Sequence, residues 1–239
     1  MRSAYDPGNP YLNWRTPLQD PPIGPGSTAL LITDMQYSDA SMEAGIFAEK
    51  RDRGLTAGLD YFEGELGEIV PKIQHLQAAC RSTGIEVIFS RIQSMSADGR
   101  DRGGAHRDLK IFCPPGSRDA QILDELAPLP GELVFSKTSG SSFNGTTLDY
   151  VLSNMGIRTL LMTGVMTSGC VESSVRDAKD LGYGVIVVSD ACASWTEDLH
   201  QASLRVVNGV FGKTMSSDDV LSRICGDAAT PRYEEQRCR

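Results

Sequence analysis

The chain alternates between short runs of apolar, β-branched residues and longer segments in which apolar residues recur every three or four positions. The short runs are typical of strands buried on both faces of a sheet, and the longer segments have the period of amphipathic helices. Strands are expected at 28–34, 85–92, 132–137, 159–165 and 184–190, with a weaker candidate at 210–215. Helices are expected at about 61–82, 118–127, 146–155, 169–181, 199–209 and 217–225.

The order of these elements predicts how they pack. Strands separated by helices form parallel sheets, because each crossover must return along the length of a strand. Gly84, Gly156 and Gly182 each follow a predicted helix, where a left-handed cap favours glycine. Right-handed crossovers then cover both faces of the sheet with helices. The predicted fold class is α/β, as a three-layer α/β/α sandwich.

Three regions follow from the distribution of this pattern. Residues 1–27 are rich in Pro, Gly and Asn and lack periodicity, so an extended N-terminal arm is expected there, and a short C-terminal tail at 226–239. The alternating elements fill one domain over 28–225. Within it, 36–60 and 93–117 lack a regular pattern, and both follow strands, so both should emerge at the carboxyl edge of the sheet. Loops of this length are usually functional lids or subunit contacts.

Composition narrows the class of partner. The chain has 239 residues, of which 40% are hydrophobic and 23% charged, as expected for a soluble protein with one sizeable core. A net charge of −8 and a pI near 4.9 argue against a nucleic-acid partner, because phosphates require a basic surface. No apolar stretch approaches the roughly 20 residues that cross a bilayer, and the N-terminus lacks an apolar signal core. We therefore expect a cytoplasmic protein with no membrane partner.

The six cysteines contain no CxxC pair. Because the chain lacks secretory cues, reduced thiols are expected rather than disulfides. Cys80 and Cys225 fall in predicted helices and Cys192 follows a strand, so they are expected to pack as small hydrophobic side chains. Only Cys170 has a reactive setting.

Three polar residues, Asp34, Lys137 and Cys170, each follow or close a predicted strand, so they should meet at one edge of the sheet. Cys170 is expected in the first turn of a helix, where free N–H groups and the helix dipole favour thiolate over thiol. A nearby Lys137 ammonium would lower the pKa of Cys170 further, and Asp34 could accept the thiol proton and deliver it to a leaving group. The N–H groups of the turn would form an oxyanion hole. Together these groups predict acyl transfer from a small amide to water.

Other interpretations remain open at this point. Each residue alone also has a structural explanation: Cys170 as packing, Asp34 as a turn cap and Lys137 as a charge at the sheet edge. A pair of Cys170 with His106 is a further alternative for the nucleophile and its base. A GxxxxG spacing begins at Gly164, but the Lys and Ser or Thr of a phosphate loop do not follow it. No HxxxH or Asp-x-His pattern near Asp34 suggests a metal, so neither a metal nor another cofactor is expected.

Three sequence blocks resemble the isochorismatase-like cysteine hydrolase superfamily, which includes nicotinamidase, N-carbamoylsarcosine amidohydrolase, ureidoacrylate amidohydrolase and biuret hydrolase. The blocks are LLITDMQ, which ends at Gln36, VFSKTSGSSFNGT around Lys137, and TGVMTSGCVESSVRDA around Cys170. The last block is similar to the family's GV-x-T-x-x-CV signature, and the resemblance covers roughly residues 28–225.

This resemblance implies a six-stranded sheet and a catalytic triad of Asp34, Lys137 and Cys170, with a thioester intermediate that water resolves. It also implies a cis peptide between Val165 and Met166, which would turn the N–H groups of Met166 and Cys170 toward the oxyanion. Nicotinamidases carry an Asp and His metal set that this sequence lacks, so a metal-independent enzyme is expected. Isochorismatases, which cleave a vinyl ether, typically lack the cysteine, so Cys170 favours C–N cleavage.

The expected function is a cysteine amidohydrolase that acts on a small amide or ureide and water and releases ammonia or carbamate. The alternatives are an isochorismatase-type vinyl ether hydrolase and a non-catalytic oligomeric binding protein on the same fold. Substrate contacts are expected at Gln36, Tyr37, Arg91, Gln93, Ser139, Phe143, Asn144 and Thr167. Packing is the alternative role for Gln36 and Phe143, and a salt bridge to the loop acids for Arg91. The long loops and the resemblance imply a homodimer or homotetramer.

Overall fold

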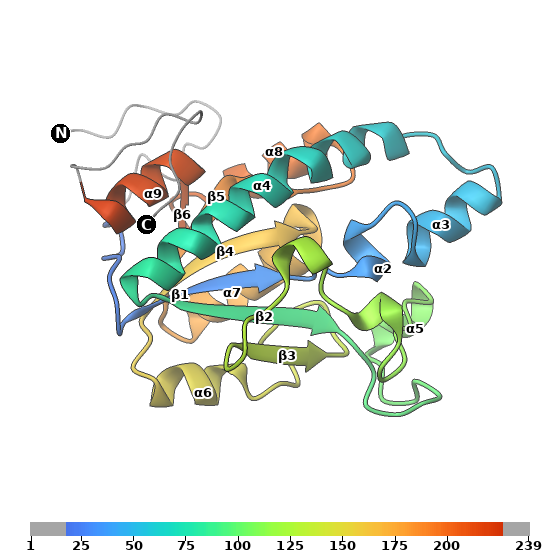
Figure 1. Cartoon of the computed structure of the whole chain (residues 1–239), viewed down its shortest axis with the longest axis horizontal. Helices are drawn as coiled ribbons and strands as arrows, with labels where there is room; N and C mark the ends of the chain where they lie inside the picture. The colour runs from blue at the N-terminus through green and yellow to red at the C-terminus, as the bar shows by residue number, and fades with distance from the viewer. Residues whose placement is uncertain (1–17, 227–239) are drawn as a thin grey trace.

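The computed structural model of the chain describes residues 18–226. The first 17 residues of the predicted arm, and the predicted tail from residue 227 onward, lie outside the described residues. The strands of the described part are β1 Thr28–Thr33, β2 Glu86–Ile92, β3 Leu133–Lys137, β4 Thr159–Val165, β5 Gly184–Ala193 and β6 Lys213–Met215. They form one parallel, six-stranded sheet in the order β3-β2-β1-β4-β5-β6, which confirms the predicted fold class (Figure 1).

The chain reverses its direction across the sheet between β1 and β4. From β1 it builds outward through β2 to β3, then returns to β4 on the other side of β1 and builds outward to β6. In open α/β sheets, ligands bind beyond the carboxyl ends of the strands at such a switch point. Asp34 follows β1 directly and Cys170 follows β4 after a short turn, so the topology brings both residues to this crevice.

Two helix layers cover the sheet. Their main helices are α4 Leu59–Thr83, α6 Leu148–Asn154, α7 Glu172–Asp180, α8 Glu197–Val207 and α9 Ser217–Cys225. Leu30 and Ile32 of β1 pack in one core cluster with α4 and α9, whereas Ala29 and Leu31 pack in a second cluster with α6, α7 and α8. Because successive strand residues face opposite sides of a sheet, the two clusters establish a three-layer sandwich. Figure 1 shows α4 in front of the sheet and α7 behind it.

The two segments that lacked a predicted pattern contain short helices. In 36–60 these are α2 (Tyr37–Ala40) and α3 (Gly45–Asp52), and in 93–117 the helix is α5 (Gly104–Asp108). Each of these helices has few residues, so its amphipathic period is too short to recognise in the sequence. Both segments nevertheless leave the carboxyl edge of the sheet, as their positions after β1 and β2 predicted.

The prediction of a helix at 118–127 is wrong. Two 3₁₀ turns occupy the region instead, η1 (Arg118–Ala120) and η2 (Asp124–Leu126). The backbone here pairs with the chain that follows β1 rather than with its own preceding turn: the Leu123 N–H donates to the Met35 carbonyl at 3.0 Å. Tertiary hydrogen bonds therefore replace the helical ones and override local propensity.

Other boundaries agree with the sequence or differ by a few residues. Gly84, Gly156 and Gly182 have φ of 76°, 76° and 95°, which confirms the left-handed caps. Strand β5 continues to Ala193, beyond its predicted end at residue 190, and β6 begins only at Lys213 because a turn precedes it.

Within residues 18–226, no helix is long and apolar enough to cross a membrane. The cysteines of this part are free thiols: Cys80, Cys113, Cys170, Cys192 and Cys225.

Candidate active site

Asp34 and Lys137 form an ion pair at the carboxyl edge of the sheet. Asp34 leaves β1 in a left-handed conformation (φ 52°), and its N–H donates to the Ser90 carbonyl at 2.9 Å. Lys137 ends β3, two strands away, and its Nζ reaches Oδ2 of Asp34 at 2.8 Å. Nζ also donates to the carbonyls of Ser139 and Gly140, each at 3.0 Å. The three oxygens fix the position of the buried ammonium.

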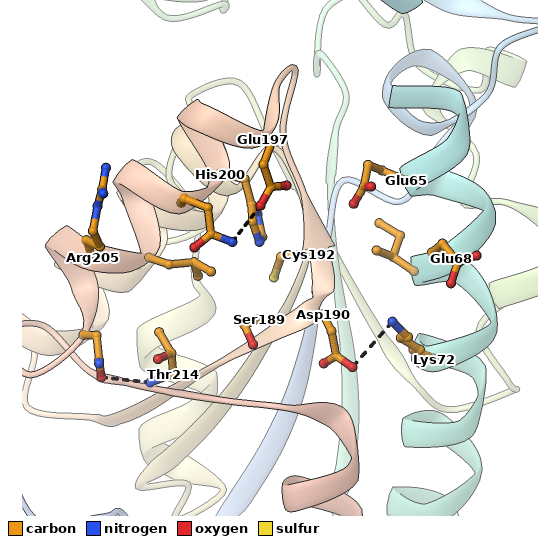
Figure 2. A pocket seen from close by; sticks show the side chains of 14 residues that line it. Glu65, Glu68, Lys72, Ser189, Asp190, Cys192, Glu197, His200, Arg205 and Thr214 are labelled. Atoms are coloured by element: carbon orange, nitrogen blue, oxygen red, sulfur yellow. Dashed lines mark hydrogen bonds and ion pairs between the residues drawn. The ribbon is translucent and has the colours of Figure 1, made fainter. Parts of the chain in front are cut away.

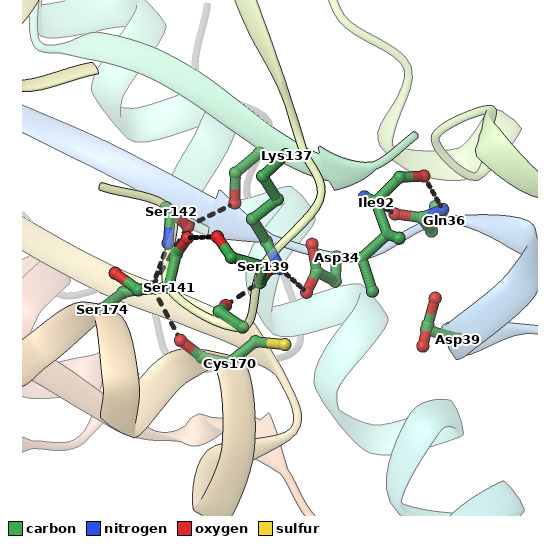
Figure 3. Close-up of polar contacts among 12 residues, drawn as sticks. Asp34, Gln36, Asp39, Ile92, Lys137, Ser139, Ser141, Ser142, Cys170 and Ser174 are labelled. Atoms are coloured by element: carbon green, nitrogen blue, oxygen red, sulfur yellow. Dashed lines mark hydrogen bonds and ion pairs between the residues drawn. The ribbon is translucent and has the colours of Figure 1, made fainter. Parts of the chain in front are cut away.

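Cys170 lies in a short π-helical turn, η3 (Thr167–Val171), between β4 and α7. The prediction that it occupies the first turn of an α-helix is therefore corrected. The backbone leaves the helical conformation at Gly169 (φ −129°, ψ −107°), so α7 begins only after the turn. In Figure 3 the sulfur points toward the carboxylate of Asp34 and the end of the Lys137 side chain.

A glycine allows β4 to approach β1 just before this turn. Gly164 has φ 104°, and a Cβ there would lie 2.1 Å from the carbonyl oxygen of Thr33. Glycine alone tolerates both this φ and this contact. The following peptide bond, between Val165 and Met166, is cis. The close approach at Gly164 carries the turn that holds Cys170 toward the end of β1.

Burial and neighbouring charges shift the pKa values of all three groups. Burial raises the pKa of the Asp34 carboxyl, and the Lys137 ammonium offsets part of this increase. It also raises the pKa of the Cys170 thiol; the Asp34 carboxylate adds to that increase and Lys137 opposes it. For Lys137, burial lowers the pKa, but the neighbouring Asp34 and Cys170 outweigh burial, so the pKa is raised and the ammonium persists.

The predicted lowering of the Cys170 pKa is therefore wrong. Desolvation disfavours the thiolate more strongly than the Lys137 ammonium favours it, and Asp34 adds a negative charge beside the sulfur. Cys170 is therefore a thiol at neutral pH, and a neighbouring base would have to remove its proton for it to act as a nucleophile.

Three serines that the sequence did not single out connect the segments around the site. The Ser142 hydroxyl donates to the Ser90 hydroxyl at 2.8 Å. The Ser174 hydroxyl donates to the Cys170 carbonyl at 2.7 Å and accepts from the Ser142 N–H at 2.9 Å. These bonds link β2, the loop after Lys137 and α7. The available sequence signal was the run of small residues beside Lys137.

Gln36 has a structural position. It is fully buried, and its side-chain amide donates to the carbonyls of Ile92 at 3.0 Å and Asp119 at 2.9 Å. Its side-chain oxygen accepts from the Ile92 N–H at 2.5 Å. Gln36 thus joins β1, β2 and the η1 turn behind the candidate site.

Phe143 and Thr167 are also buried in the described structure. Phe143 packs in the second core cluster, with its ring centroid 5.9 Å from that of Tyr183. The Thr167 hydroxyl lies 2.8 Å from Nδ1 of His200 on α8. Both side chains therefore have partners inside the fold.

Arg91 and Gln93 share one face of the chain leaving β2, as their alternation predicted. Both donate to the Ser136 hydroxyl, Arg91 at 3.2 Å and Gln93 at 3.3 Å. Arg91 also donates to the Ala120 carbonyl at 3.2 Å. These partners lie on β3 and the η1 turn, and neither is a loop carboxylate.

The remaining predicted contacts lie on loops near the site. Tyr37 is half-buried under the Arg118 guanidinium, which lies 3.9 Å from the ring centroid. The Ser139 hydroxyl donates to the Asn144 carbonyl at 2.6 Å, which closes the loop after Lys137. Asn144 itself is exposed.

Helix α2 supplies a further carboxylate, Asp39. Burial raises its pKa to about 7, and the nearby charge of Asp34 adds to the increase. Figure 3 shows Asp39 in the same close-up as Asp34 and Cys170, without a drawn contact to either. The sequence did not single out this residue because its direction depends on α2, which lies in a segment without a recognisable pattern.

Two of the cavities in the described part of the chain bear on the site. One of about 150 Å³ adjoins α2 and is lined by Ser38, Asp39, Gly45, Ile46, Glu49, Lys110, Ile111, Phe112, Cys113 and Asp119. The other, of about 550 Å³, lies between α4, β5 and α8, and none of the three candidate catalytic residues lines it (Figure 2). We associate the candidate site with the smaller cavity, because Asp39 lines it and its charge acts on Cys170.

The fold and the site together define a class of protein: a three-layer α/β/α sandwich with a buried carboxylate–ammonium pair beside a thiol, an arrangement suited to nucleophilic catalysis. The family model described as the Isochorismatase domain matches residues 28–219. The chain belongs to the isochorismatase family, as the sequence blocks predicted.

Named relatives and solved structures agree with this assignment. The chain is 33% identical over 212 residues to the ureidoacrylate amidohydrolase RutB of Pseudomonas syringae pv. syringae, with 82% of each chain covered. It is 30% identical over 172 residues to an N-carbamoylsarcosine amidase from an Arthrobacter species, covering 70% of this chain and 64% of that one. A cysteine hydrolase structure from Pseudomonas syringae pv. phaseolicola superposes with a TM-score of 0.74 at 25% identity, covering 88% and 98% of the two chains. The structure of an isochorismatase family protein from Desulfovibrio vulgaris superposes with a TM-score of 0.69 at 30% identity, covering 82% of this chain and 98% of that one.

Proposed function

We propose that this protein is a metal-independent cysteine amidohydrolase that cleaves a C–N bond of a small amide or ureide. The observation that carries the proposal is the 2.8 Å contact of Lys137 Nζ with Asp34 Oδ2, beside the sulfur of Cys170. The two relatives named for amide hydrolysis support the same bond type. A thiol at this position serves covalent acyl transfer, in which one difficult step is divided into two easier ones.

In the first half-reaction, the Cys170 sulfur attacks the carbonyl carbon while Asp34 takes the thiol proton. The Lys137 ammonium stabilises the negative charge that develops on the sulfur, and the N–H groups of Met166 and Cys170 stabilise the oxyanion. The tetrahedral intermediate then collapses as Asp34 returns the proton to the departing nitrogen. The C–N bond breaks, a neutral amine or ammonia leaves, and a thioester remains.

In the second half-reaction, Asp34 takes a proton from water, and the resulting hydroxide attacks the thioester carbon. The second tetrahedral intermediate breaks its C–S bond, and Asp34 returns the proton to the Cys170 sulfur. The product is a carboxylic acid, or a carbamate that decomposes when the substrate is a ureide. The enzyme returns to its resting thiol state, which agrees with the raised pKa of Cys170.

One observation favours a second candidate, hydrolysis of a vinyl ether. Burial raises the pKa of Asp34, so this carboxyl can hold a proton for donation to a substrate carbon. In that reaction Cys170 would be a bystander. The two functions therefore differ in whether the thiol is required.

The test measures ammonia release from biuret, ureidoacrylate, N-carbamoyl amino acids, maleamate and nicotinamide. Hydrolysis of isochorismate is measured separately as the test of the ether reaction. Cys170→Ala is expected to abolish C–N cleavage, and Cys225→Ala is the matched control because it removes a half-buried thiol on α9. Full activity of Cys170→Ala would refute the nucleophile. Activity that a chelator removes and a metal ion restores would refute metal independence.

Assembly is a separate proposal. The segment that follows β2 contains two exposed apolar residues, Met95 and Leu109, whose solvent-accessible fractions are 80% and 70%. Exposed apolar side chains suit a subunit contact. We expect a homodimer or homotetramer. Light scattering that gives the 25.9 kDa mass of a single chain would contradict it.

A further inference from the structure

Asp39 is a further carboxylate close enough to Asp34 and Cys170 for their charges to interact. It belongs to α2, which begins shortly after Asp34, and its carboxylate lines the cavity of about 150 Å³. Figure 3 shows this carboxylate in the same close-up as Asp34 and Cys170, with no hydrogen bond or ion pair drawn to either. The charges of Asp34 and Lys137 act on Asp39, and the charge of Asp39 in turn acts on the Cys170 thiol, so the cavity and the reacting atoms share one electrostatic environment.

The wall of this cavity is predominantly acidic. Its lining residues with charged side chains are Asp39, Glu49, Asp119 and Lys110. Glu49 is paired with Arg53 at 3.0 Å, whereas no salt bridge between described residues engages Asp39 or Asp119. Oδ2 of Asp39 accepts a hydrogen bond from the Ser38 hydroxyl, which orients the carboxylate without neutralising it. Lys110, the lining cation, is exposed.

One carboxylate oxygen of Asp34 also lacks a partner. Oδ1 of Asp34 is buried and has no hydrogen-bond partner among the described residues. Buried polar atoms are normally satisfied, so an unsatisfied oxygen at a reactive centre indicates a position where a polar ligand binds. The candidate site therefore has a position for a polar ligand at Asp34, and a second carboxylate, Asp39, lines a cavity nearby.

We infer that Asp39 determines the specificity of this site, which takes an amide or ureide that is neutral or cationic beyond the scissile bond and presents N–H or ammonium groups to the Asp39 carboxylate. A substrate carboxylate in the same position would meet a like charge in a partly desolvated cavity. Ureidoacrylate and carbamoylsarcosine, the compounds in the names of two relatives, are both carboxylates. The inference rests on the proposed function for the bond that is cleaved, but its charge selectivity is measurable without turnover.

The first experiment uses small thiol reagents of opposite charge. Aminoethyl methanethiosulfonate carries an ammonium and sulfonatoethyl methanethiosulfonate carries a sulfonate; each forms a mixed disulfide with a thiolate and releases methanesulfinate. Because both react with the same thiolate, the ratio of their rates at Cys170 does not depend on its pKa. Peptide mass spectrometry assigns the label to Cys170, and mercaptoethanol gives the reference ratio. We expect the wild-type ratio to favour the cationic reagent by at least about tenfold over the reference.

Matched variants assign this preference to Asp39. Asp39→Asn should lower the ratio several-fold, and Asp39→Glu should retain it. Asp52→Asn removes the same charge from the exposed end of α3 and should leave the ratio unchanged. A wild-type ratio no higher than the reference, or an equal ratio in Asp39→Asn and wild type, would overturn the inference. If Asp39→Asn does not fold, Asp119→Asn on the same cavity wall decides the question, and it too should lower the ratio.

The second experiment compares three ureas of similar size: aminoethylurea, propylurea and ureidopropionate. We expect kcat/KM of the wild type to fall in that order. In Asp39→Asn, the ratio of kcat/KM for aminoethylurea to kcat/KM for ureidopropionate should be at least about tenfold smaller than in the wild type. Ureidopropionate as the preferred substrate would refute the inference and leave the amidohydrolase proposal intact. Charge-selective labelling of Cys170 without cleavage of any urea or amide would have the opposite meaning: the inference would stand and the proposed function would fail.

Discussion

The Lys137 ammonium lies 2.8 Å from Oδ2 of Asp34, and their side chains are 0% and 2% exposed. Charges so far from water are costly unless they are paired and hydrogen-bonded. Here the ammonium also binds two loop carbonyls, so the pair fixes the loop after β3 against the end of β1. The same pair provides the proton acceptor and the positive field that the proposed reaction needs.

Removing one partner of this pair should destabilise the protein strongly. Lys137→Met leaves the Asp34 carboxylate buried without its counter-ion, so we expect the free energy of unfolding to fall by about 3–5 kcal/mol in urea denaturation and activity to be lost. Arg53→Met breaks the exposed pair with Glu49 and should cost less than about 1 kcal/mol. The double variant Asp34→Asn/Lys137→Met should regain part of the lost stability but no activity. Equal losses in the two single variants would show that the buried pair contributes no more than a surface one.

The reactivity of Cys170 should increase steadily with pH. Its pKa is raised by burial and by Asp34, so the thiolate fraction, and with it the rate of alkylation by iodoacetamide, should rise about tenfold per unit between about pH 7 and 9. Asp34→Asn removes the neighbouring negative charge and should move the whole profile to lower pH. The measurement is the rate of labelling of the Cys170 peptide. A plateau already reached near neutral pH would restore the expectation of a preformed thiolate.

Gly164 should tolerate no side chain. Alanine there would place Cβ 2.1 Å from the Thr33 carbonyl oxygen and would hold a residue with a side chain at φ 104°. We expect Gly164→Ala to cost at least about 3 kcal/mol. Gly182→Ala is the matched control, because φ there is 95° but nothing lies within 4 Å of the added carbon. Thermal unfolding that ranks the two variants as equal would refute the importance of the close approach.

The serine network should influence the rate more than it influences substrate binding. Ser142→Ala removes the hydroxyl that bridges Ser90 and lies 3.1 Å from the Ser174 hydroxyl, at an expected cost of about 1–2 kcal/mol in stability. Because Ser142 continues the loop whose carbonyls hold Lys137, kcat should fall while KM changes little. Ser153→Ala, which loses a weaker 3.4 Å contact, serves as the control. A change confined to KM would place Ser142 on the substrate side of the site instead.

The strands could be predicted because their apolar runs are buried on both faces, and the positions of Asp34 and Cys170 followed from the strand order. The sequence failed where tertiary contacts decide the outcome. The pattern of residues 118–127 predicted a helix, yet the backbone of this segment forms hydrogen bonds with the chain after β1. The pKa of Cys170 was expected to be lowered because a dipole and a lysine are visible in the sequence, whereas desolvation is not. Asp39 was missed because the direction of its side chain depends on a four-residue helix.

The last prediction concerns the stability cost of Asp39. Its pKa is raised from 3.8 to about 7, chiefly by burial and then by Asp34, so the folded state binds its proton more tightly than the unfolded chain does. Asp39 therefore stabilises the fold below about pH 4, and this contribution is lost as the pH rises through about 7. Asn carries no such charge, so Asp39→Asn should be more stable than wild type at about pH 8, by on the order of 2 kcal/mol.

The difference between Asp39→Asn and wild type should close as the pH falls toward about 4, because both side chains are then neutral. Asp52→Asn on α3 should show no such dependence, since that carboxylate is exposed. Urea denaturation at several pH values measures both differences. A constant difference between Asp39→Asn and wild type at every pH would mean that Asp39 is solvated and its pKa unshifted. A difference that grows with pH would instead identify a carboxylate that destabilises the fold, as expected of a residue retained to recognise a substrate.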